Sequence, residues 1–192
     1  EGHPWVPFAK GGDYCRFYSD VVLVVQWTEQ SRAVMSENGR VQNVASYFKP
    51  GLTWPRRTQR GFNVRSLPAG CIFSDKGPTI FLHDRDSESF ILGTLNSLLL
   101  EYILQGLTSF GSWEVGAVQR LPIHKPTTKQ RDAIASHARA ISDLKSQWDV
   151  GNEVSTSFTS PWLAQGAAQS SETLSSLLDG LAEQEAGREQ LL

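Results

Sequence analysis

Glycine and proline interrupt the middle of this chain so often that only short strands and turns can form there. Between residues 46 and 82 they stand at Pro50-Gly51, Pro55, Gly61, Pro68, Gly70 and Gly77-Pro78. Proline cannot donate to a strand ladder, and glycine favours turns. The segments between them are short and rich in β-forming residues: Asn63–Leu67, Gly70–Phe73 and Thr79–Leu82. The pattern predicts a small twisted mixed sheet with exposed loops.

The most strand-like run lies upstream of this region. Val21–Trp27 reads VVLVVQW, a continuous apolar and β-branched segment that is typical of a strand buried on both faces. Residues 1–20 are rich in glycine and aromatic side chains, which predicts a loop or irregular strand packed by its rings. The polar segment Ser36–Asn43 contains Gly39 and predicts a turn or loop.

Helical periodicity begins after Asp86 or Ser87, either of which can cap a helix. Apolar residues then recur at helical spacing up to Gly106, which is expected to end this helix. These residues are Phe90, Ile91, Leu95, Leu98, Leu99, Tyr102 and Ile103. A second segment broken by glycine, Leu107–Gln119, leads to the extended tripeptide Leu121–Ile123.

The C-terminal third is expected to be helical. Thr127 and Gln130 have the spacing of a capping box, which predicts a helix from there to Gly151. Its apolar face comprises Ile134, Ala138, Ile141, Leu144 and Trp148. Ser155–Ser171 is predicted to be a loop rich in serine and glutamine. A last helix at about Glu172–Glu185 places four leucines on one side, namely Leu174, Leu177, Leu178 and Leu181. The chain is thus divided into an α+β unit, residues 1–126, and a segment of two helices, residues 127–192.

No complete catalytic or metal site is visible in the sequence. It has neither a glycine-rich nucleotide loop nor a GxSxG elbow, and its four histidines lie in unrelated contexts. An independent hydrolase or nuclease is therefore disfavoured. Cys15 and Cys71 have no CxxC partner, which predicts no zinc site. Two lone thiols fit a reducing cytoplasm better than a disulfide scaffold.

The start and the most apolar segment bear on targeting. The first residues show no charged region followed by an apolar run, so no signal peptide is expected. The absence of an initiator Met suggests a chain cut from a larger protein. Polar residues interrupt Phe90–Leu107, so no membrane span is expected either.

Charge is distributed unevenly along the chain. The net charge is only −2, but residues 40–74 contain six basic residues and no acidic one. From Val150 to the end there are six acidic residues and one basic residue, Arg188. Such a chain can present one positive face while it stays nearly neutral overall.

The basic stretch Lys49–Arg65 combines cations with hydroxyl and amide side chains. Phosphate oxygens accept from arginine, lysine and threonine, and arginine, asparagine and glutamine also read base edges. The candidate DNA contacts are Lys49, Arg56, Arg57, Arg60 and Arg65, with Thr53, Gln59 and Asn63 as secondary candidates. Lys10 and Lys76 are expected to extend this surface. Trp54 is included, although Trp54, Phe48 and Phe62 are expected to shape the loop rather than stack on bases. Composition alone equally fits a solvated surface loop.

The order of several short motifs resembles one protein family. These motifs are Trp5–Phe8, Lys10–Gly12, Gln26-Trp27, Tyr47–Trp54, Arg65–Phe73, Leu95–Ser97 and Leu121–Ile123. Together they resemble the target-recognition region of adenine-specific DNA methyltransferases of the type IIG restriction–modification and BREX-type phage-exclusion groups. Leu121–Ile123 and the helix that follows also resemble type I specificity subunits. The resemblance covers about residues 4–141, and the acidic tail matches nothing in it.

The resemblance implies a module that recognises duplex DNA and directs adenine-N6 methylation. In that family a separate domain binds S-adenosylmethionine and grips the flipped adenine with an Asn-Pro-Pro-Tyr/Phe motif. Neither of its motifs occurs here, so no cofactor is expected in this chain, and a methyltransferase domain is expected as a partner in cis or in trans. The alternative is a protein-interaction or assembly module, which the amphipathic C-terminal helices and the acidic tail favour.

Overall fold

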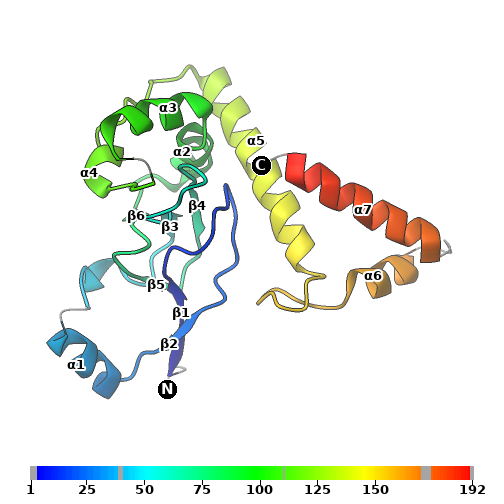
Figure 1. The fold of residues 1–192 in the computed structure, drawn as a ribbon, viewed down its shortest axis with the longest axis horizontal. Coiled ribbons are helices and arrows are strands. Elements are labelled where there is room, and N and C mark those ends of the chain that lie inside the picture. The colour runs from blue at the N-terminus through cyan, green and yellow to red at the C-terminus, as the bar shows by residue number, and fades with distance from the viewer. Residues whose placement is uncertain (1–3, 39–40, 110, 170–173, 191–192) are drawn as a thin grey trace.

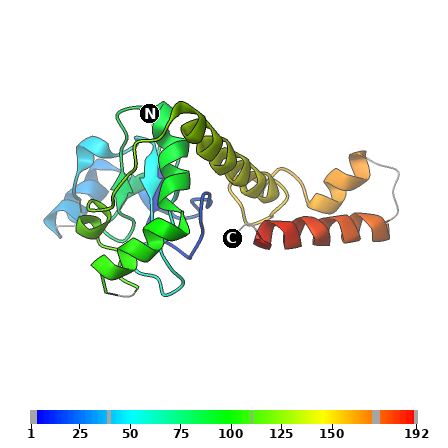
Figure 2. The same ribbon diagram turned by 90° about the horizontal axis from the view of Figure 1, so that it is seen from above.

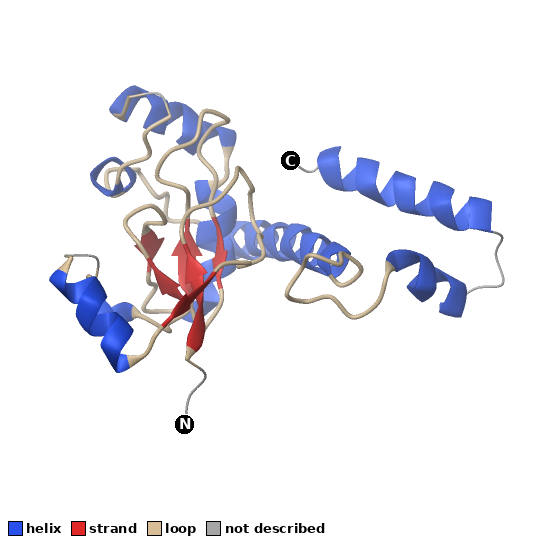
Figure 3. Ribbon diagram, turned by 60° about the horizontal axis from the view of Figure 1, so that its bottom comes forward, coloured by secondary structure: helices blue, strands red, loops and turns tan. Residues whose placement is uncertain are grey.

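The computed structural model describes residues 4–38, 41–109, 111–169 and 174–190, and it confirms an α+β fold. Two small three-stranded sheets lie together at the centre (Figures 1 and 3). In the first, β1 (Trp5–Ala9) lies between antiparallel β2 (Val24–Gln26) and parallel β5 (Ile72–Phe73). In the second, β3 (Gly51–Thr53) lies between β4 (Arg65–Leu67) and β6 (Thr79–Ile80), both antiparallel to it.

The connection between β1 and β2 joins the two sheets. Its Phe17 forms a bridge to Arg65 of β4, and the Phe17 N–H donates to the Val64 carbonyl oxygen at 2.7 Å. The Ser66 N–H donates in turn to the Phe17 carbonyl oxygen at 3.2 Å. The glycine-rich N-terminal segment is therefore part of the sheet region.

The main core lies between the second sheet and the helices that follow it. Trp54, Phe62 and Trp113 are each at most 1% exposed, and their rings pack in series, with centroids 6.0 and 5.7 Å apart. Leucines of the helices complete this cluster, namely Leu92, Leu95, Leu100 and Leu104. Trp54 and Phe62 thus lie inside this core, whereas Phe48 is 43% exposed. That these three rings shape the basic stretch stays a prediction.

The prediction of a doubly buried strand at Val21–Trp27 is wrong. Only Val24–Gln26 forms a strand, and Val22, Leu23 and Val24 are 59%, 48% and 58% exposed. These residues are exposed because β2 lies at the edge of its sheet and pairs with β1 alone. A run of apolar residues shows strand propensity but not whether another layer covers the strand.

A short exposed helix precedes the middle region. α1 (Glu29–Glu37) begins at Thr28, whose hydroxyl accepts from the Ser31 N–H at 3.2 Å, and it has no buried residue. The predicted turn at Ser36–Asn43 therefore overlaps the end of this helix, and its Gly39 and Arg40 lie outside the described residues. The 3₁₀ turn Val44–Ser46 follows.

The prediction of one helix over residues 87–106 is also wrong, because two helices meet there at a sharp bend. After the 3₁₀ turn Arg85–Ser87, α2 (Glu88–Leu95) and α3 (Leu98–Leu107) are bent by 73°. The bend exposes residues that had been assigned to the buried face, with Leu98, Leu99 and Tyr102 being 75%, 66% and 76% exposed. Among the described helices no single one is long and apolar enough to cross a membrane, although this bent pair passes that test together.

We attribute this bend to a buried asparagine, Asn96. The Val64 N–H donates to Asn96 Oδ1 at 2.9 Å, and Asn96 Nδ2 donates to the Val64 carbonyl oxygen at 2.8 Å. Asn96 thus pairs with the backbone of Val64, the residue directly before β4, as a neighbouring strand would. α3 then begins at Ser97, whose hydroxyl accepts from the Leu100 N–H. The short helix α4 (Val115–Val118) lies within the second predicted segment.

α5 (Thr128–Asp149) begins at the predicted capping box, and both hydrogen bonds of the box are present. Its predicted packing face is partly wrong, because Leu144 is 52% exposed while Lys145 is buried. Lys145 Nζ donates to the Arg16 carbonyl oxygen at 3.0 Å, so the helix binds the N-terminal segment through this cation. Against α2, the absence of a side chain at Gly93 leaves room for Ile134.

The C-terminal helices project from the rest of the molecule as a pair (Figures 1 and 2). α6 (Trp162–Gln169) lies inside the segment that was predicted to be a loop, and α7 (Leu174–Gln190) packs against it. Trp162 attaches the start of α6 to α5: its ring packs on that of Trp148, with centroids 4.5 Å apart, and its indole N–H donates to the Trp148 carbonyl oxygen. Of the predicted leucine stripe, Leu178 is 48% exposed. The domain division at residue 126 stays a prediction.

Candidate nucleic-acid interface

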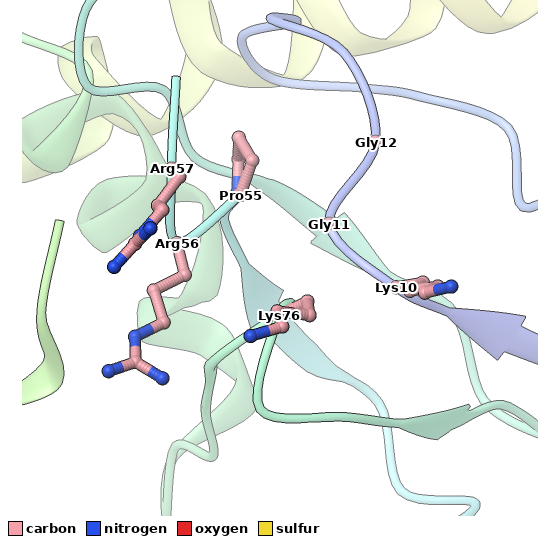
Figure 4. Close-up of a pocket in the computed structure, with 7 residues that line it drawn as sticks. All are labelled: Lys10, Gly11, Gly12, Pro55, Arg56, Arg57 and Lys76. Atoms are coloured by element: carbon pink, nitrogen blue, oxygen red, sulfur yellow. The ribbon is translucent and has the colours of Figure 1, made fainter. Parts of the chain in front are cut away.

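Four cations from three separate segments line one cavity of about 300 Å³, which we call the cationic cleft. Figure 4 shows that the side chain of Lys10 extends away from those of Arg56 and Arg57. Lys10 follows β1, Arg56 and Arg57 follow β3, and Lys76 precedes β6. Gly11, Gly12 and Pro55 form the rest of its wall. The sequence analysis proposed all four cations as DNA contacts, and the fold brings them to one place.

Backbone contacts hold these segments together. The Arg56 N–H donates to the Lys76 carbonyl oxygen at 3.0 Å, and the Trp54 N–H donates to the Pro78 carbonyl oxygen at 3.3 Å. Gly11 approaches the Lys76 turn so closely that a Cβ atom there would lie 2.5 Å from the Lys76 carbonyl oxygen. Its φ of +97° also belongs to the region that glycine adopts freely. The cleft therefore requires glycine at position 11.

We expect Gly11→Ala to destabilise the protein and to separate Lys10 from Lys76. The new Cβ clashes with backbone that cannot easily move, and the positive φ adds strain of order 1 kcal/mol. Gly70→Ala is the matched control, because Gly70 has a φ of +85° but nothing within 4 Å of a new Cβ. Urea unfolding should show a larger loss of stability for Gly11→Ala. Equal losses for the two variants would mean that the contact with Lys76 is unimportant.

One wall of the cleft is fastened to the segment before α4. The Thr58 N–H donates to the Gly111 carbonyl oxygen at 3.1 Å, and the Trp113 N–H donates to the Arg56 carbonyl oxygen at 2.8 Å. The Trp54 indole donates to the Trp113 carbonyl oxygen at 2.8 Å. These bonds fix the backbone that carries Arg56 and Arg57, so the cations project from a rigid base.

Two carboxylates face the cations of the cleft. Both oxygens of Glu114 accept from Arg56 Nε, at 3.0 and 2.9 Å, and Asp75 lies 3.2 Å from Lys76 Nζ and 3.6 Å from Arg56. The hydrogen bonds from Arg56 lower the pKa of Glu114 below its ordinary value. Glu114 therefore stays ionised at neutral pH and offsets part of the positive charge. Within the described ranges, no carboxylate lies at ion-pair distance from Lys10 or Arg57.

We expect Glu114→Gln to increase the affinity for a polyanion several-fold at low salt. The substitution removes one negative charge beside the cleft and leaves an amide oxygen that can still accept from Arg56. Asp75→Asn should act in the same direction, since Asp75 faces Arg56 and Lys76. Fluorescence anisotropy with a labelled duplex measures both. A fall in affinity for Glu114→Gln would show instead that the carboxylate orients Arg56 for binding.

The other candidate residues fall into two groups. Gln59 and Arg60 are exposed on the turn that continues from Arg57, and the Arg60 guanidinium lies 5.3 Å from the ring centre of Tyr14. Lys49 is exposed too, but it precedes β3 whereas Arg56 follows it. Lys49 is not among the residues that line the cleft.

Four candidates are buried and bonded inside the protein, namely Thr53, Trp54, Asn63 and Arg65. The Thr53 hydroxyl donates to the Pro78 carbonyl oxygen at 2.9 Å, and Asn63 Oδ1 accepts from the Cys15 N–H at 3.0 Å. Arg65 donates to the Asp13 carbonyl oxygen at 2.8 Å, and burial lowers the pKa of its guanidinium. In this conformation these side chains shape the site rather than offer a surface.

The sequence analysis did not identify four residues that shape or neighbour the cleft. Gly11 and Gly12 entered it only within a motif of the family resemblance, and the counter-charges Asp75 and Glu114 were not noted. No local signal connects Glu114 with Arg56, which lies 58 positions earlier in the chain. In the part of the chain that the structure describes, no cluster of histidine, cysteine and carboxylate side chains could hold a metal ion.

Comparison with known proteins gives a distant relationship. No protein-family model matches the chain. It is similar to the adenine-specific methyltransferase PglX of Lacticaseibacillus casei (strain Zhang), with 28% identity over 173 residues, which are 86% of this chain and 14% of that protein. It is also similar to the adenine-specific methyltransferase BrxX of Escherichia coli O9:H4 (strain HS), with 26% identity over 147 residues, 76% of this chain and 12% of that protein. The chain thus spans only 12–14% of the length of these adenine-specific methyltransferases.

Proposed function

We propose, from its distant relationship to adenine-specific methyltransferases, that this chain recognises duplex DNA and directs adenine-N6 methylation by a separate catalytic domain. The observation that carries the proposal is that Lys10, Arg56, Arg57 and Lys76 all line one cleft. Lysine and arginine side chains on a rigid backbone bind phosphate oxygens and fix the orientation of a protein on the duplex. The exposed turn beyond Arg57 then lies beside the bound strand.

The methyl transfer itself belongs elsewhere in this proposal. A base-flipping methyltransferase needs a pocket for the extruded base and a bound methyl donor. This sequence contains neither the glycine-rich S-adenosylmethionine motif nor the Asn-Pro-Pro-Tyr/Phe motif. We therefore assign both tasks to a methyltransferase domain, in cis or in trans, and assign to this chain the choice of where that domain acts.

A salt titration of duplex binding tests the proposal. Each cation that neutralises a phosphate contributes about −0.9 to the slope of log affinity against log salt, so four contacts predict a slope of about −3.6. The 192-residue chain should bind a labelled duplex at about 50 mM salt and release it as salt rises. A chain that binds no duplex at this salt concentration, or binds it independently of salt, would contradict the proposal.

One observation favours a second candidate function, contact with another protein. α3 exposes Leu98, Leu99 and Tyr102 together on one helix, and large exposed apolar patches mark sites of interaction with other proteins. The two functions are compatible, since a recognition module must also be positioned relative to a catalytic domain. Charged substitutions at Leu99 and Tyr102 should leave duplex binding unchanged while weakening association with a methyltransferase domain.

A further inference from the structure

The turn at residues 57–60 continues from the cationic cleft and exposes the side chains of Arg57, Gln59 and Arg60. The buried side of this turn contacts Trp113, which is fully buried. The Trp113 indole N–H donates to the Thr58 carbonyl oxygen at 3.3 Å. The Thr58 hydroxyl in turn accepts from the Arg60 N–H at 3.2 Å. The turn is therefore fixed on both sides of Gln59.

Gln59 differs from the two other uncharged candidates of the basic stretch, Thr53 and Asn63. Asn63 is completely buried and Thr53 is 4% exposed, and both side chains are bonded to the protein backbone. Gln59 is exposed, and its amide forms no hydrogen bond within the described part of the chain. Of these three side chains, it alone is available to a ligand.

The chemistry of an amide decides which part of DNA it suits. A glutamine side chain presents an acceptor and a donor next to each other, whereas a phosphate oxygen only accepts. The major-groove edge of adenine offers the complementary pair, the N7 acceptor and the N6 donor. Cations already surround the neighbouring cleft, so phosphate binding needs no contribution from Gln59.

We propose that Gln59 reads an adenine in the major groove while the cationic cleft holds the adjacent backbone. This inference rests on the proposed function, and it divides the basic stretch into a part that positions and a part that specifies. A side chain on a rigid turn loses little backbone entropy when it binds, which makes such a contact selective. Substitution of Gln59 should therefore change the preference for particular DNA sequences more than the overall affinity for duplex DNA.

Selection of bound duplexes from a random library tests this assignment. The 192-residue chain should enrich an A·T pair at one position, and Gln59→Ala should lose that enrichment, by about tenfold, while binding unselected duplex as before. Gln59→Glu should shift the preference toward C·G, because a carboxylate accepts from cytosine N4. The matched control is Gln105→Ala, which removes an exposed amide on α3 and should leave the selected pattern intact.

The outcomes separate the two proposals. If the unaltered chain binds duplex without preference, or if Gln59→Ala selects the same pattern, the assignment of Gln59 is overturned while the cleft stands. If the unaltered chain binds no duplex at low salt, the proposed function fails and this inference fails with it. Loss of an A·T preference in Gln59→Ala alone, with retained affinity, supports both.

Discussion

Replacement of Lys10, Arg57 and Lys76 together by alanine is expected to weaken duplex binding several hundredfold at about 0.1 M salt. The estimate follows from counterion release, in which each lost phosphate contact reduces affinity by almost a factor of ten at this salt concentration. The slope of log affinity against log salt should become shallower by about three. Arg56 is left in place because its ion pair with Glu114 helps to hold the loop.

The matched control replaces three cations that lie outside the cleft, so it removes the same positive charge from the protein. Arg32, Arg120 and Arg139 are exposed cations outside the cleft, and their triple alanine variant has the same net charge as the cleft variant. Fluorescence anisotropy should show nearly unchanged affinity for this control, because distant exposed charges are screened. Equal losses in both variants would mean that the protein responds to overall charge and that the cleft is not the binding site.

Local sequence signals predicted part of this structure well. The capping box at Thr127 predicted the start of α5 because both partners lie within one helical turn. The glycine and proline spacing predicted short strands for the same reason, since turn formation depends on neighbouring residues. The basic stretch was likewise visible as a run of charge. Each of these signals lies within a few residues of the structure it predicts.

Burial was the property that the sequence did not disclose. Arg65 and Asn63 look like DNA contacts by residue type, but they bond to the Asp13 carbonyl and the Cys15 amide, about 50 positions away. Val22–Val24 look buried by residue type but lie at a sheet edge. Both errors have the same cause. Whether a side chain faces solvent depends on which distant segment covers it, and hydrophobic pattern alone does not contain that information.

In the cleft too, the sequence predicts the residue types but not which distant segments meet. The identity of its cations was predictable because lysine and arginine suit phosphate wherever they stand. Their convergence depends on the close approach of Gly11 to the Lys76 turn, which joins segments 65 positions apart. The sequence analysis therefore named the four cations that line the cleft but not the shape of the cleft.

Asn96→Ala is expected to destabilise the protein by about 2–4 kcal/mol, the largest effect we expect for a single substitution outside the cleft. The substitution leaves the buried Val64 N–H without its acceptor, and an unsatisfied buried donor costs about 1–3 kcal/mol. The lost amide volume adds a small cavity beneath a core that contains Leu92 and Leu95. The Val64 carbonyl oxygen keeps its bond from the Phe17 N–H, which limits the loss.

Comparison with Asn38→Ala isolates the contribution of the hydrogen bonds between Asn96 and Val64. Asn38 and Asn96 both end a helix, and both side chains donate to the carbonyl oxygen four residues earlier, at 2.8 and 3.0 Å. Asn38 is exposed on α1 and has no strand partner among the described residues, so its loss should cost less than about 1 kcal/mol. Hydrogen exchange gives a second readout, because the Val64 amide should lose protection in Asn96→Ala and keep it in Asn38→Ala. If the two substitutions cost the same, Asn96 only ends α2, and the bend between α2 and α3 must have another cause.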